Sequence, residues 1–169
     1  MIGRPAACER APYFGRYIDQ VEGDSLLDAL RPSPLVALLR DADPALAGHA
    51  YAPGKWTLAG VAQHVTDTER IFAARALRVA RGDRTPLPGF DHDVFAAAAP
   101  DRPLAALADE LGAVRAATVA LFESLTDEAL RRVGTSSGGP LSARAAGWIV
   151  AGHERHHVAV VRERYLPGP

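Results

Sequence analysis

The strongest constraint on the fold is a long run of apolar residues at helical spacing. Between Thr57 and Arg81, apolar side chains return every three or four residues, and the charged side chains fall largely outside that stripe. This pattern predicts an amphipathic helix over 57–81 with one face in a core. Thr57 follows the turn-forming segment 51–55 and is the expected N-cap of the helix.

Helical signals recur along the rest of the chain. They predict a helix over 25–41 that Pro32 and Pro34 break or kink, a short piece within 91–99, a helix over 103–124 with further turns at 126–132, and a last helix over 142–165. Residues 134–140 are expected to form a flexible loop, and no segment shows the alternation of a strand.

The connection after Arg81 suggests how the helices are arranged. It contains about twenty residues and several prolines, which is long for a turn but suits a crossover between helices that run the same way. We therefore predict an all-α fold, a four-helix bundle in up-down-down-up order. The long crossover lies between the second and third main helices.

Size and charge limit the domain organisation and the partners. With 169 residues, the chain fits a single domain, and we expect an N-terminal arm at 1–16 and one bundle domain at 17–169. The net charge of −1 lacks the basic character that nucleic-acid binding usually needs. No apolar run approaches the length of a membrane span, and the N-terminus lacks the pattern of a signal peptide. We expect a cytoplasmic protein with no nucleic-acid or membrane partner.

The histidines are the candidate metal ligands. The chain has six histidines and one cysteine, Cys8, so a metal site must use nitrogen and oxygen atoms. His153 and His157 are one helical turn apart, on the face of the last helix that should point into the bundle. His64 lies on the shoulder of the apolar stripe of the long helix and can complete a three-histidine site. His156 points about 60° away and is a weaker candidate.

Other polar residues near these ligands are open to more than one interpretation. Asp67 lies one turn beyond the ligand on the long helix, and Glu154 is next to a ligand on the last helix. Both are candidates to orient imidazoles or to relay protons, and both could instead be solvated. His49 and His92 fall in expected loops and are interpreted as surface residues.

The segment 153–157 also satisfies the HExxH motif of metalloproteases, with Glu154 as the would-be general base. Such enzymes take a third ligand beyond the motif. Only twelve residues follow His157, and Glu163 lies too close on the same helix to close a site. The bundle site is therefore the better interpretation.

An ordered set of motifs resembles the DinB/YfiT-like superfamily of metalloenzymes. The motifs are Tyr51-Ala52-Pro53-Gly54-Lys55-Trp56-Thr57, His64-x-x-Asp67-x-Glu69-Arg70, Gly82-Asp83 with Pro86-Leu87-Pro88-Gly89-Phe90-Asp91, and Gly152-His153-Glu154-x-x-His157. The resemblance covers residues 17–166. It implies a four-helix bundle, a homodimer, and a divalent metal held by His64, His153 and His157. We expect the metal to be Zn²⁺ or Ni²⁺, and Mn²⁺ or Fe²⁺ is the alternative.

Characterised members of this superfamily include transferases and isomerases that use low-molecular-weight thiols such as bacillithiol or mycothiol. The break at 31–34 departs from the continuous first helix common in the superfamily. Because that helix walls the cavity, the substrate does not carry over from the resemblance.

The function predicted from the sequence is a metal-dependent enzyme acting on a small molecule, either a hydrolase or a thiol-dependent S-transferase. A metal ion can acidify water for hydrolysis or bind a thiol as thiolate. Because Cys8 lies outside the motifs, the thiol would come from a cofactor. The alternative is a non-catalytic metal-stabilised bundle or stress-response binding module. In that case a fourth protein ligand, such as His156 or an acidic side chain, would close the site.

Overall fold

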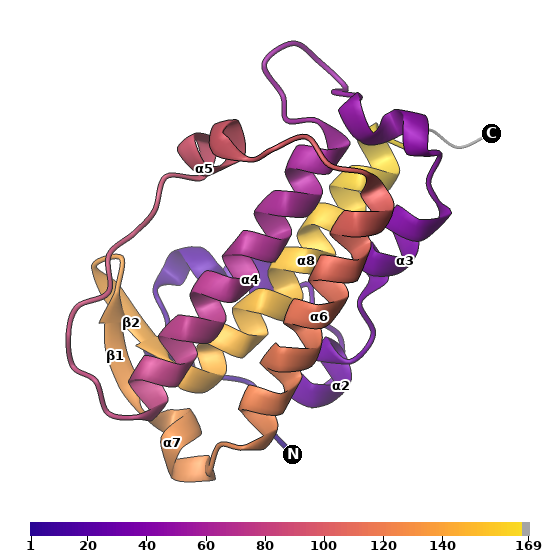
Figure 1. Cartoon of the computed structure of the whole chain (residues 1–169). Helices are drawn as coiled ribbons and strands as arrows, with labels where there is room; N and C mark the ends of the chain where they lie inside the picture. The colour runs from indigo at the N-terminus through magenta and orange to yellow at the C-terminus, as the bar shows by residue number, and fades with distance from the viewer. Residues whose placement is uncertain (167–169) are drawn as a thin grey trace.

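The structure, a computed structural model, describes residues 1–166 of the chain. Its body is a bundle of helices lying side by side (Figure 1). The bundle elements are α2 (Leu26–Leu30) with α3 (Pro34–Asp41), α4 (Leu58–Ala80), α6 (Leu104–Glu123) and α8 (Ala143–Arg164). The predicted four-helix bundle is confirmed, with α2 and α3 together taking the place of the first helix.

Short elements flank the bundle. They are α1 (Gly15–Ile18), α5 (His92–Ala98), α7 (Asp127–Arg131) and 3₁₀ turns at Ala7–Glu9, Pro12–Phe14 and Pro44–Gly48. α5 and α7 lie where helical pieces were predicted, whereas α1 crosses the expected boundary at residue 16. The N-terminal segment lies against α8, since Ile2 is buried and the indole N–H of Trp148 donates to the Gly3 carbonyl at 3.0 Å. None of the helices within 1–166 is both long and apolar enough to cross a membrane.

Contacts near the helix ends fix the helix directions. Arg102, just before α6, contacts Gln63 near the start of α4, so α4 and α6 leave the same end of the bundle. The Tyr165 hydroxyl, after α8, donates to the Trp56 carbonyl, before α4, so α8 returns to that end. The crossover through α5 thus joins two parallel helices, while α2, α3 and α8 run the other way (Figure 1).

Pro32 and Pro34 separate α2 from α3, as predicted. Pro34 is the first residue of α3, where its missing N–H costs nothing. The break turns two donors of the first helix towards α8: the Ser33 hydroxyl and the Leu35 N–H both bond to one Glu154 oxygen, at 2.5 and 3.3 Å. The interruption therefore provides hydrogen bonds for a buried carboxylate.

The expectation of a flexible loop at 134–140 is wrong. β1 (Val133–Ser136) and β2 (Gly139–Ser142) form an antiparallel hairpin. Its turn residues Ser137 and Gly138 have φ values of 51° and 79°, and a two-residue turn with both φ angles positive is typical of tight hairpins. Serine rarely adopts positive φ, and a segment rich in Gly, Ser and Thr lacks the alternating apolar residues that mark strands.

The buried apolar side chains form two clusters along the bundle. One surrounds α2, the end of α4 and the start of α8, and the other surrounds α3, the starts of α4 and α6, and the end of α8. Between them lies a layer of buried polar side chains from three helices, which includes His64, Thr66, Thr68 and Glu69 of α4, Arg115 of α6, and His153 and Glu154 of α8. The candidate site lies in this polar layer.

Candidate metal centre

The three predicted ligands meet between α4 and α8. The Nε2 atom of His153 lies 3.1 Å from Nε2 of His64 and 3.2 Å from Nε2 of His157. One ligand atom from each histidine lies within 4.8 Å of the other two. Among residues 1–166, no carboxylate or thiol side chain joins these three histidines in the group. The structure thus brings together the triad that helical spacing indicated.

The nitrogen positions fit a metal ion. Two nitrogens bound tetrahedrally to one zinc at about 2.0–2.1 Å lie about 3.3 Å apart, close to the observed separations. A neutral ring nitrogen has either one hydrogen or one lone pair, so Nε2 of His153 cannot bond well to both neighbours at once. A divalent cation satisfies all three lone pairs together.

Burial keeps these imidazoles neutral. Burial first, and neighbouring histidines second, lower the pKa of His64 to about 4 and the pKa of His157 to about 3. The same two causes lower the pKa of His153 well below its usual value. The neutral form is the one that binds metals, so the site needs no deprotonation at neutral pH.

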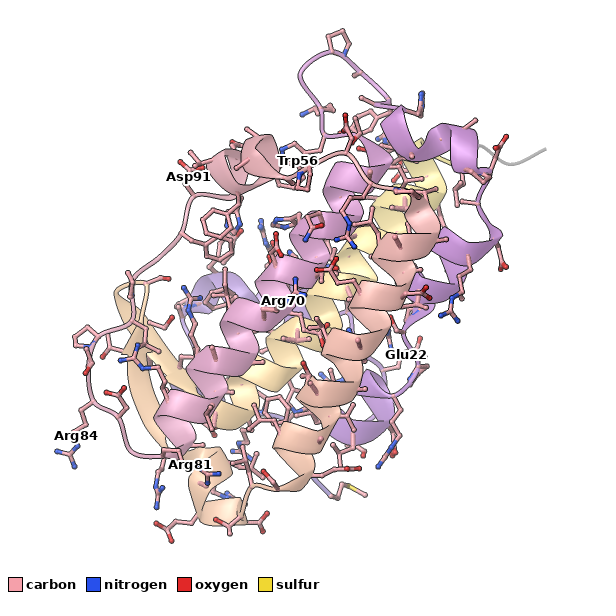
Figure 2. All side chains as sticks on the ribbon, viewed as in Figure 1. Glu22, Trp56, Arg70, Arg81, Arg84 and Asp91 are labelled. Carbon is pink, nitrogen blue, oxygen red and sulfur yellow. The ribbon has the colours of Figure 1, made fainter. Side chains whose placement is uncertain are left out.

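Two cavities adjoin the triad. One of about 380 Å³ lies between the N-terminal segment, α4, the crossover and the hairpin, and it reaches His153. The other, of about 420 Å³, lies between the loop before α4, α5 and the end of α8, and it reaches His157. Trp56 and Asp91, just before α4 and α5 respectively, lie at the end of the bundle where α4 begins (Figure 2). Ligands can therefore approach the triad from two sides.

Comparisons with known proteins place the chain in a family. The sequence model of the DinB superfamily matches residues 27–161, which include all three histidines. The chain belongs to the DinB superfamily. Its structure is similar to that of YfiT from Bacillus subtilis, described as "a probable metal-dependent hydrolase with an unusual four-helix bundle topology". The TM-score is 0.70 at 17% sequence identity, over 95% of this chain and 90% of that chain. No match was found among the curated proteins.

Within this DinB fold, a glycine brings α1 against the site. A Cβ on Gly152 would lie 2.0 Å from the backbone oxygen of Tyr17. Only glycine therefore lets the α1 backbone lie directly on α8. The Tyr17 ring then packs edge-on against the His153 ring, with centroids 5.3 Å apart.

Neither predicted carboxylate is hydrogen-bonded to a ligand imidazole in the structure. Asp67 is half-buried and accepts from the side-chain amide of Gln63 at 3.0 Å and from Arg70 at 3.3 Å. Glu154 is fully buried, so its alternative as a solvated residue is also wrong. It points about 100° away from the preceding histidine, towards α3 and α6, where Arg115 lies 2.9 Å from one of its oxygens.

Sequence reasoning missed a buried ion-pair network on the other side of α8. Arg115 donates to the two oxygens of Glu69 at 2.9 and 2.8 Å and also pairs with Glu154. Burial opposes its charge, but the two carboxylates raise the pKa of Arg115 above its usual value. The sequence does contain a signal for this network. Arg115 is a charged residue at helical spacing between Leu111 and Phe122, in a stripe that is otherwise mostly apolar.

The remaining histidines lie outside the triad. His49 and His92 are exposed, as predicted. His92 is nevertheless close to the site: it begins α5, and its ring centroid is 5.2 Å from that of His64. His156 packs against the Tyr17 ring at 5.5 Å. The position of His92 depends on the path of the crossover, which periodicity does not indicate.

Proposed function

We propose that this DinB-superfamily protein is a metal-dependent enzyme in which His64, His153 and His157 hold a divalent ion. The supporting observation is the convergence of three Nε2 atoms between two cavities: those of His64 and of the half-buried His157 lie 3.1 and 3.2 Å from that of His153. Three protein ligands leave a position for water or substrate, whereas structural sites usually take four. Zn²⁺ and Ni²⁺ are the first candidates for an all-imidazole site, with Mn²⁺ and Fe²⁺ behind them.

The protein's own side chains would hold the site rigid. A bound divalent ion supplies acidity, lowering the pKa of water towards about 7 or converting a thiol to thiolate. The Trp56 ring packs on His64 with centroids 4.6 Å apart, and Tyr17 covers His153. These rings pack against the imidazoles and help to hold the nitrogens in place.

Hydrolysis of a small molecule is the first candidate reaction. It is supported by the likeness to YfiT, which is described as "a probable metal-dependent hydrolase". It is also supported by the cavity of about 380 Å³ at His153, which has the size of a small-molecule site rather than of a protein groove. A small ester or amide is the substrate class that fits these features.

A thiol-dependent S-transferase is the second candidate. Transfer needs two substrates, and separate cavities reach the triad at His153 and at His157. The thiol would come from a low-molecular-weight cofactor, because Cys8 is exposed and outside the triad.

A non-catalytic role would need a fourth protein ligand, and His156 instead packs on Tyr17. A homodimer and a cytoplasmic location stay predictions, the former testable by light scattering.

Turnover assays on metal-loaded protein test this proposal. We expect activity in one class of a panel that contains esters, amides, and a thiol with an electrophile. His157→Ala removes one ligand and should abolish the activity. His49→Ala removes an exposed histidine outside the triad and should leave it unchanged. Equal turnover by wild type and His157→Ala, or silence across the panel, would contradict the enzymatic role.

A further inference from the structure

A buried arginine without an acidic partner lines the cavity that reaches His153. Arg75, on α4, is 6% exposed, and burial is the one cause that lowers its pKa. Arg115, buried to a similar degree, is paired with two carboxylates. A buried cation is costly unless an anion pairs with it. No acidic side chain lines this cavity among the residues described, so the anion for Arg75 is missing from the protein itself.

The guanidinium of Arg75 is held in place by its surroundings. One terminal nitrogen donates to the Pro88 carbonyl at 2.7 Å, and the group lies 4.8 Å from the centre of the Phe72 ring and 5.8 Å from that of Phe90. The preceding residue, Leu87, is hydrogen-bonded to the hairpin through both its N–H and its carbonyl. A fixed guanidinium loses little conformational freedom when it binds a planar anion.

Two hydroxyls in the same cavity are buried without a hydrogen-bond partner. They belong to Thr68 of α4, 3% exposed, and Ser136 of β1, 2% exposed. Leaving a buried hydroxyl unpaired costs free energy, so its presence beside a cavity indicates a missing ligand atom. Together with the N–H groups of Arg75 that do not bond to Pro88, these hydroxyls are donors without a matching acceptor.

The rest of the cavity is mostly apolar and leads to the triad. Its walls include the rings of Phe14, Tyr17, Phe72 and Phe90, and His153 lies within its lining. On α4, residues 64, 68, 72 and 75 follow at spacings that keep them on one face. The Cα atoms of residues 64 and 75 are about 16 Å apart along the helix axis. The cavity therefore joins a cationic end to the candidate metal centre.

We propose that this cavity binds a small carboxylic acid with an apolar, ring-sized body. Arg75 and the hydroxyls of Thr68 and Ser136 hold the carboxylate, the aromatic walls cover the body, and the opposite end of the ligand faces the triad. The proposal rests on the metal-dependent function proposed above, since it assigns that enzyme a substrate class.

Calorimetric titration of the metal-loaded protein tests the proposal. The probes are ω-phenyl carboxylates of increasing chain length, each compared with its primary amide, which has the same shape without the charge. At least one acid should bind about tenfold or more tightly than its amide. Arg75→Met should abolish that preference, and Ser136→Ala should reduce it. Arg78→Met removes an exposed arginine of the same helix, paired with Asp83, and should leave the preference intact.

Two results would overturn the proposal: no acid binds in preference to its amide, or the preference survives in Arg75→Met. A lower unfolding temperature of Arg75→Met with an unchanged preference would mean that Arg75 only secures Pro88. If Arg75→Met does not fold, Arg75→Lys and Ser136→Ala decide the question.

Metal content measured on the same samples separates the two proposals. Protein that holds metal but shows no preference for the acid contradicts the carboxylate site alone. Protein that holds no metal but prefers the acid contradicts the metal function alone.

Discussion

Replacing Arg115 with methionine should destabilise the protein strongly, because it leaves the buried Glu69 without its cation and Glu154 with only the more distant Arg155, 3.7 Å away. Glu69 is 2% exposed and Glu154 is 0% exposed, and Arg115 pairs with both. Methionine is similar in length and apolar, so the change removes the charge without a large cavity. The loss should therefore report on the ion-pair network.

The magnitude follows from the contacts that disappear. Removing one partner from a buried ion pair costs about 3–5 kcal/mol. The hydrogen bond from Arg115 to the Leu30 carbonyl, at 2.9 Å, adds about 1 kcal/mol. The donors at the start of α3 still serve Glu154, which moderates the cost. We expect a loss of about 4 kcal/mol in the free energy of unfolding, a large part of the total stability of a domain this size.

Urea unfolding followed by circular dichroism measures this loss. Arg40→Met is the matched control, since Arg40 pairs with Asp109 across α3 and α6 with both side chains exposed, and its loss should stay below about 1 kcal/mol. Adding Glu69→Gln to Arg115→Met should restore part of the stability, because it removes one of the unpaired charges. If Arg115→Met costs no more than Arg40→Met, the reasoning about buried charge in this bundle is wrong.

Three further outcomes are expected. Gly152→Ala should lower the unfolding temperature although alanine favours helices, because its Cβ would meet the Tyr17 backbone; a stabilised variant would show that α1 does not lie on α8. Burial raises the pKa of Glu9, but hydrogen bonds led by that from Arg144 lower it to about 2, so this pair should stabilise the protein fully above about pH 4.5 and lose that effect as pH falls towards 2. In acid titrations Arg144→Met should thus lose its stability difference from wild type, and a constant difference would refute this. Thr57→Ala should cost about 1 kcal/mol in urea unfolding through loss of the α4 N-cap, unlike Thr57→Ser.

The helices and the triad could be predicted because their signals are local. Thr57 caps α4 with a side-chain hydrogen bond, as its position before an apolar periodic segment indicated, and Ser142 caps α8 in the same way. His153 and His157 share a helix face by spacing alone. His64 required only one further assumption, that α4 and α8 face each other.

The features that sequence reasoning missed depend on contacts between distant segments. The hairpin rests on a Ser137–Gly138 turn and on two hydrogen bonds with Leu87 in the crossover, one donated and one accepted by Leu87, which no periodicity reveals. The role of Glu154 depends on the break before α3 and on Arg115 of α6. Such positions become meaningful only when the packing of the helices is known.

Metal stoichiometry tests the three-histidine centre most directly. The protein would be purified without a metal-affinity tag, supplied with Zn²⁺ or Ni²⁺, freed of excess ion, and analysed for its elements. Wild type and His49→Ala should each retain about one ion per chain, and His157→Ala should retain almost none. Equal metal content in wild type and His157→Ala would contradict the site.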